Sequence, residues 1–389
     1  MFHRSLNVAA WTLVLVSLVS VANAGSDAPE AGRARLRDLG ITTGRYAPGP
    51  LNAITDVGGV LVGHATIVRG DGALVPGHGP VRTGVTAVLP HGGDLWNQKV
   101  PAAAFVMNGN GEVTGLHWVN ESGALEVPIL LTNTMNVGRV SDAAVAWMIR
   151  KYPDLGIGDD VVLPVVGECD DSFLNDAQAR AVGEPEVFSA LDTAHSGPVA
   201  EGAVGAGTGM MAFEFKGGIG TASRVLSKEQ GGFTVGALVN ANFGTREDLR
   251  VAGIPVGEKI RDLMPKDMND GSIVIVVATD APIDSRQCMR LARRAIVGLA
   301  YTGATVRHTS GDFAVVFSTA SRIPHYPKEL LYSVTLLSDG HITPLFEATE
   351  EAVEEAILNA ICMARTMVGR DGNTAYAIPL DRLRQAVSH

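Results

Sequence analysis

The stretch "MNDGSIVIVVATDAP", residues 268–282, sets an Asn-Asp-Gly turn before a serine that opens an almost unbroken apolar run. A short run this rich in Val and Ile predicts a β-strand that is buried on both faces. Ser272 at its head has two interpretations. Its hydroxyl can cap the preceding turn, or it can attack the carbonyl of Gly271, because glycine has no Cβ to shield that bond and the turn can adopt strained left-handed conformations.

The second interpretation makes the chain cut itself between Gly271 and Ser272. The hydroxyl would move the acyl group from nitrogen to oxygen, and water would then release a new amino terminus. A terminal serine carries nucleophile and base in one residue, since an α-amine has an unperturbed pKa of about 7.7 to 8.0 and can accept the hydroxyl proton near neutrality. These features are those of an N-terminal nucleophile hydrolase.

The composition is that of a compact, enzyme-like protein. Hydrophobic residues make up 46% of the 389 residues and charged residues 19%, with a formal net charge of −10. The acidity, with no cluster of Lys and Arg among aromatic residues, excludes nucleic acid as an expected partner. No GxSxG, HExxH, CxxC or P-loop motif occurs, and the ten histidines lack the spacing of metal ligands, so we expect neither a metal nor a cofactor. The glycine-rich "GAVGAGTGM" and "KGGIGTASR" are interpreted as tight turns and close backbone approaches.

The N-terminus has the pattern of a signal peptide over residues 1–24. Arg4 precedes an apolar stretch from Val8 to Val21, and Ala22-Asn23-Ala24 is a small-x-small cleavage site. A membrane anchor is the alternative, although the apolar stretch is shorter than the roughly 20 residues that cross a bilayer. We therefore expect a periplasmic or secreted protein with no membrane contact after signal removal. Residues 25–50 are expected to form an exposed leader over the body, and the three cysteines allow at most one disulfide.

The mature chain reads as alternating strands and helices. Helical periodicity predicts helices over 140–152, 284–300 and 349–368, with Ser141 and Thr349 as candidate caps. Apolar runs between turn residues predict strands at 86–90, 102–109, 127–133, 161–168, 233–244, 272–280, 313–320 and 332–340. Strands so continuously apolar need cover on both faces, so the pattern predicts one layered α/β domain over 25–389, with sheet packed on sheet between helices.

Nine segments together resemble the L-aminopeptidase/D-Ala-esterase/amidase family, which includes the β-aminopeptidases. They follow family order from about residue 39 to the C-terminus: "ITDVGGVLVGHAT", "GNGEVTGLHWVNESG", "LLTNTMNVG", "PVVGECDDSFLND", "GAVGAGTGM", "KGGIGTASR", "LVNANFGTREDLRVAGIPVG", "NDGSIVIVVATDAP" and "SGDFAVVFST". The resemblance implies a four-layer αββα sandwich, similar to N-terminal nucleophile hydrolases in mechanism but with a distinct topology. It also implies self-cleavage into 25–271 and 272–389, two chains that stay associated, commonly as a tetramer of such pairs.

The resemblance also assigns catalytic roles. Ser272 matches the nucleophile, and Asn242 matches the side-chain donor of the oxyanion hole, although Asn240 lies on the same strand face and stays an alternative. Ser310 and Asp312 match a hydroxyl–carboxylate pair that orients the nucleophile and relays its proton. Residues two apart on a strand share one face, so these two can aim at one point. Many family members carry Glu at the position of Asp312.

Substrate binding is assigned in the same way. Glu168 matches the carboxylate that holds the substrate's free amino group, and Asp170 stands where some members have Tyr. The acidic neighbours of Cys169 oppose thiolate formation, which makes this cysteine a poor rival nucleophile. The residues expected to line the cleft are Asn133, Thr134, Gly207 and Gly218.

The leading hypothesis is an aminopeptidase that acts on short peptides, amides or esters with β-aminoacyl or D- or L-α-aminoacyl groups, through an acyl-enzyme on Ser272. An acyltransferase of the ornithine acetyltransferase type is the alternative, although those enzymes use Thr as the new terminus. A catalytically silent binding protein is a third interpretation.

Overall fold

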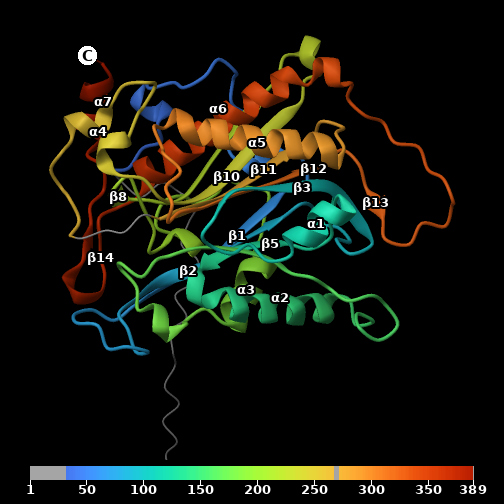
Figure 1. The fold of residues 1–389 in the computed structure, drawn as a ribbon, viewed down its shortest axis with the longest axis horizontal. Helices are drawn as coiled ribbons and strands as arrows, with labels where there is room; N and C mark the ends of the chain where they lie inside the picture. The colour runs from blue at the N-terminus through green and yellow to red at the C-terminus, as the bar shows by residue number, and fades with distance from the viewer. Residues whose placement is uncertain (1–31, 267–270, 389) are drawn as a thin grey trace, which may run out of the picture.

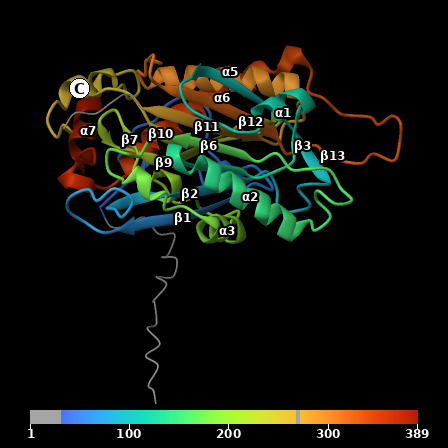
Figure 2. The same cartoon turned by 60° about the horizontal axis from the view of Figure 1, so that its bottom comes forward.

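Two β-sheets lie face to face between two layers of helices in the computed structural model, which describes residues 32–266 and 271–388 (Figure 1). This is the predicted αββα order of layers, and a view turned by 60° shows the same stacking (Figure 2). The predicted signal peptide and the Asn269-Asp270 part of the turn before Ser272 lie outside the described residues. Among the residues described, no helix has the length and apolar character that a membrane span requires.

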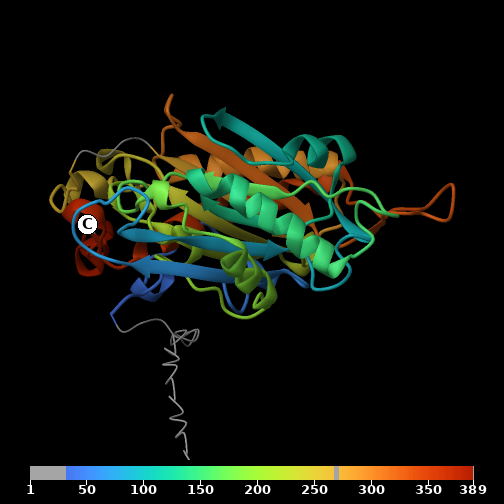
Figure 3. The same cartoon turned by 90° about the horizontal axis from the view of Figure 1, so that it is seen from below.

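The first sheet has four strands in the order β1 (Leu61–Arg69), β2 (Val81–Leu89), β5 (Ile129–Asn133) and β6 (Val165–Cys169). Paired strands within this sheet are antiparallel, except that β5 and β6 are parallel. Helices α2 (Val137–Lys151) and α3 (Glu184–Asp192) cover its outer face (Figure 3).

The second sheet contains the strand that the opening sequence predicts. Its order is β13 (Ile323–Pro324), β3 (Gln98–Gly109), β12 (Gly311–Ser318), β11 (Ser272–Thr279), β10 (Thr234–Asn242) and β9 (Gly218–Val225), and β4 (Ala124–Leu125) pairs with β3. Strand β11 is parallel to β12 and antiparallel to β10. Helices α5 (Ser285–Tyr301) and α6 (Thr343–Met363) cover the outer face of this sheet.

The smaller elements lie at the ends of the sandwich. They are α1 (Leu116–Ser122), α4 (Val256–Lys259), α7 (Leu380–Val387), the hairpin of β7 (Met211–Ala212) with β8 (Phe215–Lys216), and the pair β14 (Met367–Val368) with β15 (Thr374–Ala375).

Strand β11 is buried along its whole length, as predicted. Ile273, Ile275 and Val277 belong to the core between the second sheet and α5 and α6. Val274 and Val276 belong to the core between the two sheets. Because side chains alternate along a strand, β11 has no solvated face.

Glycines let the helices sit directly on the strands. A Cβ on Gly220 of β9 would lie 1.9 Å from the carbonyl oxygen of Ala356 in α6, and a Cβ on Gly63 of β1 would lie 2.0 Å from that of Ala190 in α3. The prediction of close backbone approach in "KGGIGTASR" is therefore confirmed. The prediction of a turn there is wrong, because residues 218–225 form strand β9, whose pairing with β10 overrides the low strand propensity of glycine.

Several predicted boundaries are wrong. Residues 332–340 form no strand: residues 332–338 belong to an exposed segment, 325–338, that follows β13 and projects from the body (Figure 1), and Asp339–His341 form a short 3-10 helix before α6. Its Val and Leu residues have no neighbouring strand to pair with. Residues 161–164 also lie outside β6, which begins at Val165.

The two candidate caps lie inside their helices, because both helices begin earlier than periodicity suggests. Ser141 is four residues into α2, and Thr349 donates its hydroxyl to the carbonyl of Leu345 at 2.7 Å within α6. Helix α5 does begin with a cap, since the Asp284 side chain accepts from the Gln287 N–H at 2.7 Å.

The N-terminal segment is embedded more deeply than an exposed leader. Leu36 is fully buried in the core beside α6. Arg37 pairs with Glu355 at 2.9 Å, and Arg33 donates to the carbonyl of Cys362 at 2.8 Å. The guanidinium groups of Arg33 and Arg37 thus bind residues 33–37 to α6, which explains why a polar stretch can be ordered there.

We predict that Gly220→Ala destabilises the protein by about 1 to 3 kcal/mol, the usual cost of overpacking, because its new Cβ collides with the backbone of α6. Gly138→Ala is the matched control: Gly138 lies within α2 and a Cβ there meets open space, so this variant should keep or gain stability by up to about 1 kcal/mol. Urea unfolding followed by circular dichroism compares the two variants. Equal unfolding midpoints for Gly220→Ala and the wild type would contradict the close packing of β9 against α6.

Candidate active site

Ser272, Asn242 and Asp312 lie at the same end of the second sheet, on three neighbouring strands. Ser272 is the first residue of β11 and lies opposite Asn242, the last residue of β10. Ile273 lies beside Asp312 of β12. The Ser272 Oγ accepts a hydrogen bond from the Gly311 N–H at 3.0 Å, and the residue is 7% exposed. The nucleophile candidate is therefore held in place and largely buried.

Gly271 packs against Asn242 so closely that only glycine fits. A Cβ at this position would lie 1.8 Å from the Asn242 carbonyl oxygen and 2.8 Å from its Nδ2. The physical reason for glycine before Ser272 is thus close approach to Asn242.

The amide of Asn242 has a fixed orientation. Its Oδ1 accepts from the Met211 N–H at 2.8 Å, and its Nδ2 donates to the Asp170 carbonyl at 2.9 Å. An amide nitrogen has two hydrogens, so a second donor is left toward Gly271. Asn240 lies opposite Val274, two residue pairs deeper in the sheet, and is fully buried. Only Asn242 is therefore adjacent to Ser272.

Ser310 and Asp312 form a buried pair, with the Ser310 Oγ 2.5 Å from the Asp312 Oδ2. The pairing of β12 with β3 shifts register between Asp312 and Phe313, where Met107 of β3 is the extra residue, and bulges of this kind re-aim side chains at sites. Burial raises the pKa of the Asp312 carboxyl, and the hydrogen bond from Ser310 offsets part of that rise.

This pair lies on the helix-facing side of the sheet, since Ala314 and Val316 pack under α5 and α6. Ser272 shares the opposite face with Val274. Ser310 and Asp312 line a small pocket together with Gly271 and Leu299. The structure thus places the Ser310–Asp312 pair next to Gly271, on the opposite face of the sheet from the Ser272 side chain.

Glu168 reaches the site from the other sheet. It lies on β6, is 2% exposed, and its Oε1 accepts from the Glu112 N–H at 2.9 Å while Oε2 accepts from the Thr134 hydroxyl. Burial raises the pKa of Glu168, the hydrogen bonds from Thr134 and Glu112 lower it, and the nearby charges of Asp170 and Glu112 raise it. A carboxylate has about four acceptor positions, so this one can also accept from an ammonium group.

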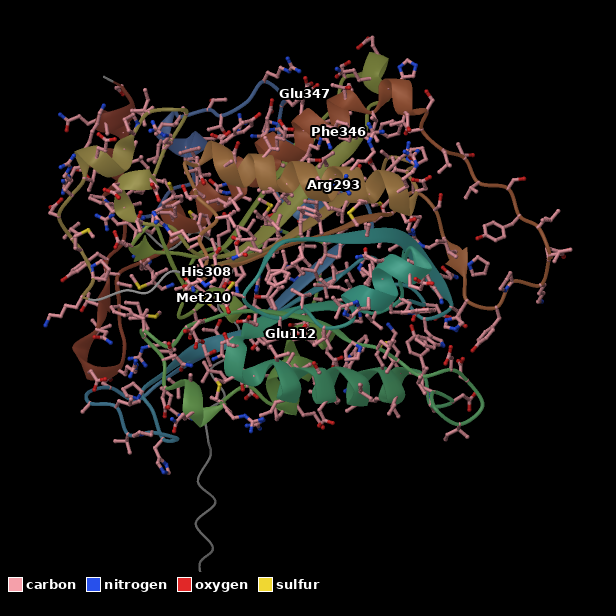
Figure 4. All side chains as sticks on the ribbon, viewed as in Figure 1. Glu112, Met210, Arg293, His308, Phe346 and Glu347 are labelled. Carbon is pink, nitrogen blue, oxygen red and sulfur yellow. The ribbon has the colours of Figure 1, made fainter. Side chains whose placement is uncertain are left out.

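Gly111 packs closely between Glu168 and the start of β12. A Cβ on Gly111 would lie 2.7 Å from the Glu168 Oε1 and 3.6 Å from the Cα of Gly311, the residue that donates to Ser272. The labelled Glu112, Met210 and His308 lie near the level at which the two sheets meet (Figure 4). The site is therefore built across the two sheets at their ends.

Asn133 differs from the other predicted site residues because its amide is bonded to protein on all sides. Its Nδ2 donates to both carboxylate oxygens of Asp171, at 2.8 and 2.9 Å, and its Oδ1 accepts from the N–H and side chain of Asn136. It is 1% exposed. The structure places the neighbouring Thr134, and not Asn133, against Glu168.

The two glycines predicted to line the cleft pack a loop against β9. A Cβ on Gly207 would lie 2.3 Å from the Ile219 nitrogen, and one on Gly218 would lie 2.0 Å from the Gly202 carbonyl oxygen. All three cysteines are unpaired and buried. Burial raises the pKa of Cys169 well above its usual range, which agrees with its dismissal as a nucleophile.

Two residues at the site were missed by sequence reasoning. Asn108 donates to the carbonyls of Ser310 at 2.5 Å and Arg307 at 2.8 Å, and so holds the turn that carries Ser310. The "NGN" triplet at 108–110 was a signal of a built turn. Lys216 is fully buried next to Asn242, and nothing local in "FEFKGG" indicates where its ammonium goes. Within the ranges that the structure describes, no group of three or more His, Cys, Asp or Glu could hold a metal ion.

Comparisons with known proteins identify the family and fold of the chain. A family model described as "Peptidase family S58" matches residues 52–375. The beta-peptidyl aminopeptidase BapA of Sphingosinicella xenopeptidilytica is 43% identical over 388 residues, which cover 96% of this chain and 95% of that protein.

Two solved structures share the fold. A β-aminopeptidase from a Burkholderia species has a TM-score of 0.85 at 45% identity, covering 91% of this chain and 98% of that one. The L-aminopeptidase D-Ala-esterase/amidase of Ochrobactrum anthropi has the same TM-score and the same coverage at 42% identity. That structure is described as a prototype for the serine aminopeptidases and a new variant of the N-terminal nucleophile hydrolase fold, which confirms the predicted fold class. The chain therefore belongs to peptidase family S58.

Proposed function

We propose that the protein is a self-processing serine aminopeptidase that releases the N-terminal residue of short peptides, amides or esters through an acyl-enzyme on Ser272. The observation that carries this proposal is the placement of Ser272 at the head of a fully buried strand, with the preceding glycine pressed against the amide of Asn242. The relatives with solved structures are named as β-aminopeptidase and as L-aminopeptidase D-Ala-esterase/amidase, so the acyl groups we propose are β-aminoacyl and D- or L-α-aminoacyl.

Self-cleavage would use the same groups as turnover. The Ser272 Oγ attacks the Gly271 carbonyl carbon, and the free hydrogen of the Asn242 Nδ2 stabilises the oxyanion. The C–N bond then breaks as the nitrogen gains a proton, which leaves an ester on Oγ that water hydrolyses to a Gly271 carboxylate and a Ser272 α-amine. The Ser310–Asp312 pair lies next to Gly271 in a small pocket, and it is suited to orient the new α-amine and to pass on its proton.

In turnover the free α-amine of Ser272 takes the Oγ proton, and Oγ attacks the carbonyl of the substrate's first residue. The leaving amine or alcohol gains a proton, and water then hydrolyses the acyl-enzyme. Glu168 pairs with the substrate's ammonium group, which explains a requirement for a free N-terminus. Loss of one oxyanion donor lowers kcat by about 10² to 10³ in subtilisin, which sets the scale expected for Asn242.

Contacts between the two proposed products would keep them together. Residues 272–389 supply β11, β12, α5 and α6, and β11 lies between β10 and β12 inside the sheet. The fully buried Arg224 of the first product pairs with Glu355 of the second at 2.7 Å. Separation would expose this core and leave buried charges unpaired, so the cut would not release either piece.

The acyltransferase alternative is not supported by the relatives described above, and the serine at position 272 also argues against it. A silent binding protein does not explain why a glycine, an amide and a hydroxyl–carboxylate pair converge on one peptide bond.

We also propose that the chain is exported after removal of residues 1–24 and that it works as a homo-oligomer. The segment 325–338 supports the second proposal, because Leu330 and Leu331 on it are 95% and 84% exposed. Apolar side chains this exposed favour contact with another protein surface, and a second copy of this chain is the partner we propose.

We predict that the double variant Leu330→Asp with Leu331→Asp has a lower oligomer mass by light scattering. An unchanged mass would remove this segment from the interface.

We predict that Ser272→Ala gives one uncut band on denaturing electrophoresis and no hydrolysis of an aminoacyl p-nitroanilide. Gly271→Ala should slow the cut, since its Cβ collides with Asn242. Ser318→Ala is the matched control: Ser318 is a buried serine at the far end of β12, and this variant should process as the wild type does. Two bands from Ser272→Ala would refute cleavage by this hydroxyl.

We predict that kcat/KM falls as the pH is lowered through the raised pKa of Glu168, because only the carboxylate pairs with the substrate ammonium. Glu168→Gln should remove this acid limb and raise KM about 10- to 100-fold, as expected for losing a hydrogen bond to a charged group. Glu112→Gln is the control: it keeps the backbone N–H that donates to Glu168, so KM should stay near the wild-type value. Because the charge of Glu112 raises the pKa of Glu168, its loss should move the acid limb of the kcat/KM profile slightly toward lower pH. A wild-type KM in Glu168→Gln would exclude Glu168 as the ammonium partner.

A further inference from the structure

Lys216 is a buried cation that the proposed chemistry does not use. It lies on β8, is fully buried, and its Nζ donates to the backbone carbonyls of Met210 at 2.7 Å, Gly217 at 2.8 Å and Gly207 at 3.0 Å. Burying an ammonium group is expensive unless it is well bonded. Here all three of its hydrogens find an acceptor: Gly207 and Met210 lie before the β7–β8 hairpin, and Gly217 lies directly after it.

One of these acceptors belongs to the peptide group that holds Asn242. The Met210 carbonyl accepts from Lys216, and the N–H of the same peptide, that of Met211, donates to the Asn242 Oδ1 at 2.8 Å. The peptide plane is therefore fixed from both sides. Because Oδ1 is held toward Met211, Nδ2 is turned toward Asp170 and Gly271.

We propose that Lys216 is a positioning residue for the oxyanion hole, acting through the Met210–Met211 peptide on the amide of Asn242. The inference rests on the proposed role of Asn242. Hydrogen bonds in a chain polarise one another, so a cation on the carbonyl strengthens the Met211 N–H as a donor, and that bond in turn strengthens the Nδ2–H of Asn242. The same chain keeps the amide from flipping and presenting its oxygen to the developing negative charge.

The charge of Lys216 is supported by one buried acid. Burial lowers the pKa of Lys216 to about 7, and the charge of Asp171 opposes this shift. Burial in turn raises the pKa of Asp171 to about 7, while the Asn133 amide that donates to it works against the rise. Asn133 thus holds in place the acid whose charge favours the protonated form of Lys216.

A double-mutant cycle tests the inference on the full-length protein with an aminoacyl p-nitroanilide as substrate. Lys216→Met should lower kcat about 10-fold, a part of the 10² to 10³ expected for loss of the whole donor, and leave KM within about twofold. It should also slow the appearance of cleaved chains. In an Asn242→Ala background, adding Lys216→Met should cause no further fall in kcat, because the group through which Lys216 acts is gone.

Lys99→Met is the matched control, since Lys99 is a buried lysine on β3 that pairs with Glu126 at 2.5 Å. It should cost stability without lowering kcat. If Lys216→Met does not fold, Lys216→Gln replaces it: a neutral amide still donates, so a smaller loss of kcat is expected, again absent in the Asn242→Ala background.

Three results would overturn the inference, and they separate it from the proposed function. A wild-type kcat in Lys216→Met, or in its Gln replacement, with a large loss in Asn242→Ala would refute the role of Lys216 alone. An equal further loss in the Asn242→Ala background would show a general structural role. A wild-type kcat in Asn242→Ala would refute the oxyanion role of Asn242 and the inference with it.

Discussion

Strand β11 has no free side: both faces are buried and both edges are paired. This constraint fixes Ser272 at the head of the strand, and it also sets the positions of the site residues on the neighbouring strands. Asn242 is set by antiparallel register, Asp312 by parallel register, and Gly311 by its hydrogen bond to the Ser272 hydroxyl. A nucleophile held this firmly needs little reorganisation before it attacks, which is how preorganised sites lower a barrier.

The two sheets divide the work of the site. The second sheet supplies the groups that act on the bond to be cut, and the first sheet supplies Glu168, which recognises the amine of a substrate. Face-to-face packing brings the two sheets together here, and glycine at 111 permits the close approach of Glu168 to the start of β12. Burial raises the pKa of both Glu168 and Asp312, so the same exclusion of water that strengthens their interactions also makes them sensitive to pH.

Sequence reasoning reached the central strand because its signal is local: eight consecutive residues that are all buried have an unmistakable composition. It also placed Ser310 and Asp312 on one face from their spacing, and the resemblance supplied their partners. It failed where tertiary contacts decide. Pairing turns the glycine-rich 218–225 into a strand, and the lack of a pairing strand leaves the apolar 332–340 exposed. The partners of Lys216 are backbone carbonyls, which no side-chain pattern reveals.

Intact-mass spectrometry of the purified, active protein tests the central claim most directly. The account predicts two polypeptides, residues 25–271 and 272–389, with Ser272 as the first residue of the smaller one. A single mass continuous through the bond between Gly271 and Ser272, in material that hydrolyses its substrate, would contradict it.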